Sequence, residues 1–269
     1  MPDIAQFTAP QHWRAIDLVS DLHLCEALPK TTQAFFEHLK HTDADAVFIL
    51  GDLFEVWVGD DQGHRAFERA CADALAAQAG RRWLGFMHGN RDFLVGPAFM
   101  RMAGLHLLPD PLRLDAFDRV WLLTHGDALC LEDEPYQQFR KMVRSAKWQQ
   151  DFLAQPFEAR WELAGRIRSE SRSRKAAAPD PSLWADVDRT EAIGWLEQAQ
   201  AVTLLHGHTH RPGNEDWENG LGRLVLSDWD LDRPSDAAGR AEVIRLDARG
   251  LSRRAPCTGA AIRPSPMST

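Results

Sequence analysis

Short apolar runs that end in polar residues or glycine recur along the chain. They occupy residues 15–20, 46–50, 83–87, 120–124 and 201–205, and two later runs lie at 223–227 and 241–246. Apolar runs of about four to eight residues with such boundaries predict strands that are buried on both faces. Helical spacing of apolar residues marks 31–41 and 62–79 between them. The alternation of strands and helices therefore predicts an α/β core.

Residues 135–181 interrupt this alternation. The segment has no strand-like run, and its pattern predicts two or three helices followed by a loose linker rich in Ser, Arg, Ala and Pro. Between residues 140 and 175 there are ten basic and four acidic residues, a net charge of +6 that leaves −14 for the rest of the chain. Interleaved with these bases are five aromatic residues, Phe139, Trp148, Phe152, Phe157 and Trp161.

Two interpretations of this insert remain open from the residues alone. In the first, the aromatic residues form an ordinary helical core and the bases form a solvated face. In the second, the segment is a basic, amphipathic cap for an anionic and partly apolar ligand, or for a membrane surface.

Composition restricts the classes of protein that fit. The 269 residues carry a net charge of −8, which argues against a general nucleic-acid-binding protein. Four cysteines without a CxxC spacing fit a reducing compartment. No apolar run approaches the length of about 20 residues that a membrane span needs, and no signal peptide is recognisable. We therefore expect a soluble cytoplasmic protein, with a disordered tail over residues 251–269 that is rich in Pro, Ser and Thr.

Histidine and carboxylate side chains gather where the predicted strands end. Asp21 and His23 follow the first run, Asp52 the second, and Asn90 the third. His125 follows the fourth run, and His206, His208 and His210 follow the fifth. In an open α/β sheet, ligands bind at the carboxyl edge of the strands. We therefore expect these side chains, from five segments, to converge on one crevice.

The residue types indicate metal chemistry. Carboxylates and imidazoles together suit manganese, iron or zinc, whereas magnesium and calcium favour sites made only of oxygen ligands. Asp21 and His23, like His208 and His210, stand two residues apart, so an extended backbone directs both side chains of each pair to the same face. The pattern therefore predicts a pair of divalent metal ions.

The motifs D-x-H, GD, GNRD, HGD and GH-x-H, in this order, resemble the calcineurin-like metallophosphoesterases. The longer strings GDLFEVWVGDD, HGNRDFLVG, HGDALCLEDEPYQQFRKMVR and HGHTHRP resemble the UDP-2,3-diacylglucosamine pyrophosphohydrolase family of the lipid A pathway. The similarity covers residues from about 16 to 150 and from about 184 to 230. It implies an α/β fold: a sandwich of two mixed β-sheets flanked by helices, with a helical cap insertion. The core would span 15–134 and 182–250, and the cap 135–181.

The resemblance also implies a role for each site residue. Asp21, His23, Asp52 and His210 would bind the first metal ion; Asp52 would bridge to the second, which Asn90, His125 and His208 would complete. Asn90 and Arg91 would be catalytic, and the substrate contacts would be Asn90, Arg91, Asp133, Ser173 and His208. The family's Asn and Lys contacts in the cap are replaced here by Ala and Asp, so Arg174 or Lys175 would substitute. His206 has no metal role in this assignment.

The activity implied by the resemblance is hydrolysis of UDP-2,3-diacylglucosamine to UMP and 2,3-diacylglucosamine 1-phosphate. It implies two divalent ions, which we expect to be Mn²⁺, and a peripheral position on the cytoplasmic face of the inner membrane, in contact with anionic lipid and not with nucleic acid. Three alternatives remain: a related metallophosphoesterase for another phosphodiester or nucleotide diphosphate, a non-catalytic scaffold of the same fold, and a nucleic-acid phosphodiesterase.

Overall fold

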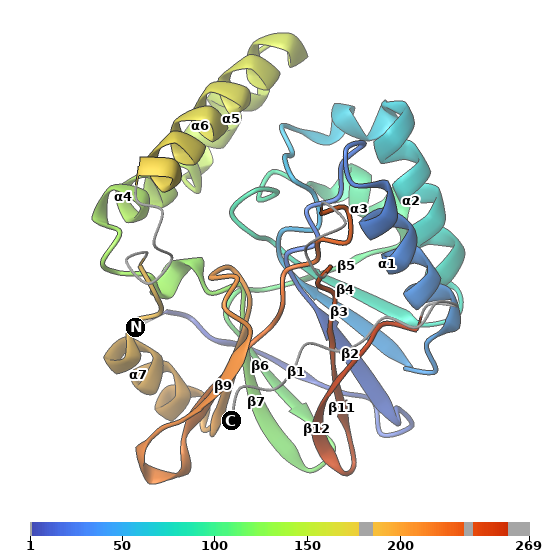
Figure 1. The fold of residues 1–269 in the computed structure, drawn as a ribbon, viewed down its shortest axis with the longest axis vertical. Coiled ribbons are helices and arrows are strands. Elements are labelled where there is room, and N and C mark those ends of the chain that lie inside the picture. The colour runs from blue at the N-terminus through green and yellow to red at the C-terminus, as the bar shows by residue number, and fades with distance from the viewer. Residues whose placement is uncertain (1, 178–184, 234–238, 258–269) are drawn as a thin grey trace.

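Two six-stranded mixed sheets form the centre of the computed structural model, which describes residues 2–177, 185–233 and 239–257 (Figure 1). The first sheet has the order β1 (Ala5–Thr8), β6 (Leu112–Ala116), β7 (Arg119–Thr124), β8 (Thr203–His206), β10 (Gly222–Val225) and β9 (Gly213–Asp216). The second has the order β12 (Gly250–Arg254), β11 (Val243–Asp247), β2 (Ala15–Val19), β3 (Ala46–Leu50), β4 (Trp83–Met87) and β5 (His106–Leu108). Strands β2 to β5 are parallel to one another, as are β7, β8 and β10.

Apolar side chains from both sheets meet in the space between them. Ile16, Leu18 and Phe48 of the second sheet pack in the same cluster as Leu114 and Leu205 of the first, and all five are fully buried. Because successive strand residues point to opposite faces, Val19, Val47 and Ile49 face the other way, into a separate cluster. Strands that are apolar on both faces are therefore covered on both sides, which confirms the predicted two-sheet α/β fold.

Helices cover the outer faces of both sheets. Three of them, α1 (Pro29–His41), α2 (Ala66–Ala79) and α3 (Pro97–Ala103), pack on the second sheet. Figure 1 shows these helices at the right of the molecule. The outer face of the first sheet is covered by α7 (Arg189–Ala199), whose Trp195 and Leu196 pack against Leu122 and Leu204. Short 3₁₀ turns occur at Asp60–His64, Asp127–Leu129 and Glu218–Gly220.

Three further helices, α4 (Glu134–Val143), α5 (Ala146–Leu153) and α6 (Phe157–Ala177), follow β7 and lie outside both sheets, at the upper left of Figure 1. The side chains of Asp133 and Ser145 cap the first two of these helices by accepting hydrogen bonds from backbone amides. The predicted loose linker is wrong up to Ala177, since α6 continues through its Ser and Arg residues; a helix-breaking proline comes only at position 179. Residues 178–184 lie outside the described residues.

The prediction of a disordered tail from residue 251 onward is also wrong at its start. Strand β12 pairs antiparallel with β11 from Gly250 opposite Asp247 to Arg254 opposite Val243. This pairing satisfies backbone groups along the edge of the second sheet, so a polar sequence is held in a regular strand. Residues 258–269 lie outside the described residues. In the described part of the chain, no helix combines the length and the apolarity that crossing a bilayer requires.

Candidate metal centre and adjoining cavity

The carboxyl ends of five strands meet at one crevice. β2, β3 and β4 of the second sheet bring Asp21, His23, Asp52 and Asn90, and β7 and β8 of the first bring His125, His208 and His210. The predicted convergence of these side chains therefore occurs, with both sheets of the sandwich contributing to it. The backbone N–H of His208 donates to Asp21 Oδ2 at 2.9 Å and so joins the two sheets at the site.

Five of the seven predicted metal ligands have positive φ angles. These angles are 53° for Asp21, 49° for His23, 53° for Asp52, 65° for His208 and 54° for His210. Residues other than glycine adopt this left-handed conformation uncommonly, and such residues gather at functional sites because the surrounding structure must maintain them. The neighbouring Gly51 has a φ of 90°, and an added Cβ would lie 2.4 Å from His125 Nδ1.

One group of ligand atoms is formed by Asp21, His23 and His210. The Nε2 atoms of His23 and His210 lie 3.2 Å apart, and they lie 3.9 and 3.3 Å from Asp21 Oδ1. That oxygen is buried and has no hydrogen-bond partner among the described residues. Two imidazole nitrogens turned towards one orphaned carboxylate oxygen form an arrangement that a shared cation explains.

Asp52 stands between this group and His125. Its Oδ2 lies 4.0 Å from His23 Nε2, and its Oδ1 lies 3.8 Å from His125 Nε2. Candidate ligand atoms of Asp21, Asp52 and His125 all lie within 4.8 Å of one another. The other ring nitrogen of His125, Nδ1, lies 2.9 Å from the carbonyl oxygen of Leu50, which orients the ring in the way that metal-binding histidines are commonly held.

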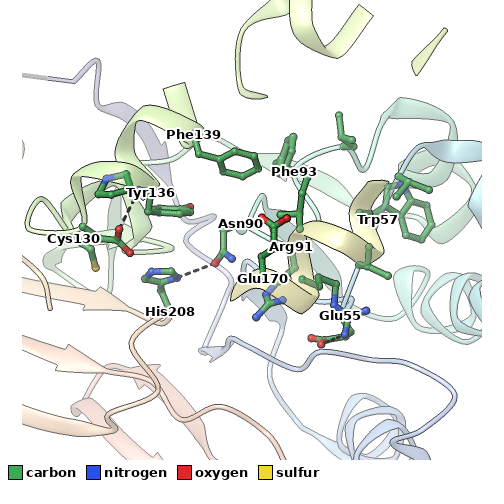
Figure 2. Close-up of a pocket in the computed structure, with 18 of the residues that line it drawn as sticks. Glu55, Trp57, Asn90, Arg91, Phe93, Cys130, Tyr136, Phe139, Glu170 and His208 are labelled. Carbon is green, nitrogen blue, oxygen red and sulfur yellow. Dashed lines mark hydrogen bonds and ion pairs between the residues drawn. The ribbon is translucent and has the colours of Figure 1, made fainter. Parts of the chain in front are cut away.

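Asn90 completes the second group of ligand atoms. Its Oδ1 lies 3.0 Å from His125 Nε2 and 2.8 Å from His208 Nδ1. Figure 2 shows the contact between Asn90 and His208. The residues present therefore fit two divalent cations: Asp21, His23, Asp52 and His210 would hold one, and Asp52, Asn90, His125 and His208 the other.

The charges and burial in the crevice keep one carboxylate ionised, raise the pKa of one imidazole and lower the pKa of another. Burial disfavours the charge on Asp21, but His210 and the other nearby imidazoles hold its pKa far below the ordinary range. Burial also disfavours the charge on His125, yet Asp52 and Asp21 raise its pKa to about 9. Burial and the charge of His125 lower the pKa of His208 to about 3. Cations would therefore meet strong carboxylate charge together with a neutral imidazole.

Three carboxylates that have no role in the sequence analysis lie around the candidate ligands. Glu55 Oε2 lies 3.1 Å from His23 Nδ1. Asp92 accepts from the backbone amides of Gly89 and Phe54, and burial raises its pKa to about 7. Asp127 accepts from the Tyr136 hydroxyl at 2.6 Å and from Arg140 Nε at 2.8 Å. All three occur in the motif strings, but their contacts depend on residues distant in sequence or on backbone groups that no motif indicates.

Two of the helices that follow β7, α4 and α6, are attached around the crevice through basic side chains. Arg144 Nη2 donates to the carbonyl oxygen of Gly89 at 2.9 Å, and Arg168 pairs with Glu55. The buried Arg160 donates to Asp61 and to the carbonyl oxygen of Val58. These bases are therefore neither a fully solvated face nor all free for a ligand.

An apolar cavity of about 330 Å³ lies between these helices and the metal ligands. Figure 2 shows Tyr136 and Phe139 of α4 with Phe93 on one side of it, above Asn90 and His208. The ring of Tyr136 stacks over His208, with centroids 6.0 Å apart. The wall of the cavity also includes Trp57, Leu94, Trp148, Phe152, Ala164 and Ile167. A small molecule with an apolar portion can therefore bind beside the side chains of the candidate metal centre.

The structure places most of the predicted substrate contacts at this cavity. Asn90, Arg91, Asp133 and His208 all line it. Ser173 is exposed on α6 and is not among the described lining residues, so its role remains a prediction. His206 is fully buried with Nδ1 2.9 Å from the carbonyl oxygen of Gly207, and burial lowers its pKa to about 4.

The profile of the calcineurin-like phosphoesterases matches residues 15–212. A UDP-2,3-diacylglucosamine hydrolase of Aromatoleum aromaticum is 40% identical over 240 residues, which cover 86% of this chain and 97% of that protein. One of Shewanella piezotolerans is 41% identical over 215 residues, covering 78% of this chain and 88% of that protein. The solved structure of a phosphoesterase from E. coli is 14% identical in sequence. The match covers 90% of this chain and 92% of that chain, with a TM-score of 0.43.

The profile extends across the strands that carry the seven candidate ligands. The chain belongs to the calcineurin-like phosphoesterases and, within them, to the family of the UDP-2,3-diacylglucosamine hydrolases.

Proposed function

We propose that this protein hydrolyses the diphosphate of UDP-2,3-diacylglucosamine to UMP and 2,3-diacylglucosamine 1-phosphate, with two Mn²⁺ ions as cofactors. The observation that carries this proposal is the apolar cavity that opens directly beside Asn90 and His208. An enzyme that acts on small soluble phosphate esters needs no such cavity. An enzyme whose diphosphate substrate bears two acyl chains needs an apolar space for them. The names of the relatives support the same substrate.

The chain's own groups suit a diphosphate. When bound, the two ions would polarise a phosphoryl oxygen and activate water for attack on phosphorus. Arg91 directly follows the ligand Asn90, and its guanidinium can form paired hydrogen bonds with phosphate oxygens and offset the charge that grows on them. Because the leaving group is a phosphate monoester, the reaction needs no strong general acid.

We further propose that the helices α4, α5 and α6 form the cap predicted for residues 135–181 and that this cap shelters the acyl chains. Tyr136, Phe139, Trp148 and Phe152 project from α4 and α5 into the cavity wall. A substrate with two acyl chains does not leave a bilayer freely, so we place the enzyme on the cytoplasmic face of the inner membrane, held peripherally by anionic lipid.

The test is a hydrolysis assay with Mn²⁺ on three substrates: UDP-2,3-diacylglucosamine, a simple soluble phosphodiester and a free nucleoside diphosphate. We expect the lipid nucleotide to be cleaved with by far the largest kcat/KM and UMP to be released. Preference for the simple diester or the nucleotide would instead support a related phosphoesterase that acts on another substrate.

A further inference from the structure

A second cavity, of about 800 Å³, adjoins the first on the other side of the metal centre. The two cavities share five lining residues: Glu55, Val56, Arg91, Arg168 and Thr209. The second cavity is walled by the loop after β2, the start of α2, α6, the loop after β8 and, after β10, residues 228–230, 233 and 240.

The metal ligands divide between the two cavities. Asn90 and His208 line the first, and His23 and His210 line the second. Arg91 lines both, at their junction, and Figure 2 shows it below Asn90 on the side towards Glu55. A diphosphate that sits on the metal centre would therefore extend one of its two substituents into each cavity.

The two walls differ in chemistry. Of the 22 described residues that line each cavity, eleven in the second are Arg, Asp or Glu, against five in the first. An acyl chain in the second cavity would desolvate these charged groups without offering them hydrogen bonds, which is costly. A nucleoside presents carbonyl, imide and hydroxyl groups that can bond with them.

A flat surface for a base is present in the second cavity. The guanidinium carbon of Arg65 lies 4.8 Å from the ring centroid of Trp161, which itself stacks on Phe157. Arg65 is exposed, and Trp161 is partly buried. Guanidinium and aromatic planes are the groups on which proteins stack bases.

We propose that the second cavity is the nucleoside subsite, in which uracil lies against the Arg65–Trp161 wall while the acyl chains occupy the first cavity. This assignment rests on the proposed function, because it takes the substrate to be a nucleoside diphosphate lipid. It places the nucleotide phosphate on the side of His23 and His210 and the sugar phosphate on the side of Asn90.

The test measures binding of UMP and of 2,3-diacylglucosamine 1-phosphate, separately, by calorimetry to the Mn²⁺-loaded protein. In Arg65→Ala we expect the Kd of UMP to rise about tenfold and that of the lipid product to stay unchanged. Arg69→Ala is the matched control, because Arg69 lies one turn further along α2, pairs with Asp73 and lines neither cavity. Phe139→Ala, in the first cavity, should show the reverse selectivity.

Two results would overturn the subsite. One is unchanged UMP affinity in Arg65→Ala, in a protein whose circular dichroism and melting temperature match the wild type. The other is a loss of UMP binding in Phe139→Ala in place of Arg65→Ala. Failure of the proposed function is a separate result. If the wild-type protein binds UMP through Arg65 but does not hydrolyse UDP-2,3-diacylglucosamine, the nucleoside subsite is supported and the proposed substrate is wrong.

Discussion

Asp52 is the residue on which the two halves of the metal centre depend, since its two carboxylate oxygens face His23 and His125. In Asp52→Ala we expect kcat to fall about 10³-fold or more, because metal-ion stabilisation worth several kcal/mol would be lost. Metal analysis should find fewer than two ions per chain. Asp73→Ala, at an exposed position on α2, is the control. Near-normal turnover of Asp52→Ala with two bound ions would contradict the binuclear assignment.

Arg91 lies at the junction of the two cavities and directly follows the candidate ligand Asn90. Arg91→Lys keeps the positive charge but loses the planar fork that bonds two phosphate oxygens at once. We expect its kcat to fall about 10²-fold, as when one preorganised donor to a transition-state oxygen is removed. Arg101→Lys, at an exposed position on α3, should leave kcat unchanged. Equal rates for Lys and Arg at position 91 would reduce this residue to a distant charge.

The convergence of the candidate ligands could be predicted from sequence, but the residues that contact them could not. A histidine or carboxylate that follows an apolar strand is visible in the sequence, and parallel strands bring such residues to one edge. Glu55 and Asp127 also stand in the motif strings, but their partners His23, Arg168, Tyr136 and Arg140 are identified only once the chain folds. The positive φ angles at five of the ligands likewise have no sequence signal, because none of these residues is glycine.

At the scale of elements, the strands that apolar runs predict all lie inside the two sheets and not at their edges. The four strands at the sheet edges, β1, β9, β5 and β12, escaped the apolar-run criterion, as did β6, whose residues alternate between buried and partly buried. Edge strands are short and partly solvated, so their sequences resemble loops. Whether a polar segment forms a strand depends on the neighbour that supplies its hydrogen bonds.

Helix α1 is joined to the second sheet by a buried ionic cluster around Asp17 on β2. Asp17 accepts from Arg245 Nε and Nη2 at 2.7 and 2.9 Å and from Thr42 Oγ1 at 2.6 Å. Burial alone would raise the pKa of Asp17, but the bonds with His38, Arg245 and Thr42 hold that pKa far below the ordinary value. Asp17→Asn removes the buried charge partner of Arg245, which keeps its pair with the exposed Asp43, so we expect a loss of about 3 kcal/mol in the free energy of unfolding at pH 7.

The pH dependence of this loss follows from the sign of the shift. A carboxylate whose folded pKa is lowered contributes stability above its unfolded pKa of about 3.9, and this contribution fades as pH falls below that value. Urea unfolding of both proteins between pH 3 and 7 should show a constant difference above about pH 5 that narrows towards pH 3. A difference that does not change over this range would show that Asp17 acts by shape and not by charge.

For the molecule as a whole, the insert presents less positive charge at its surface than its sequence contains, because several of its arginines pair with groups outside the insert. Arg140, Arg144, Arg160 and Arg168 are bonded to core groups. Reversing the charge of Arg140 or Arg144 would therefore disrupt the attachment of α4 and would confound any test of membrane binding. Lys141 and Lys147 remain exposed, as do Met142 and Leu153 of the same helices, whose exposed fractions are 50% and 43%.

These four residues are the surface that we expect to meet the bilayer. Lys141→Glu combined with Lys147→Glu should weaken binding to anionic vesicles at least about 30-fold, since each lysine near an anionic surface contributes about 1 kcal/mol. Sedimentation with anionic and with zwitterionic vesicles measures the effect, and hydrolysis of a soluble phosphodiester should not change. Lys40→Glu combined with Arg69→Glu, on α1 and α2, is the control with the same change of net charge. An equal loss in both pairs would mean that net charge, and not this face of the insert, governs the attraction to the membrane.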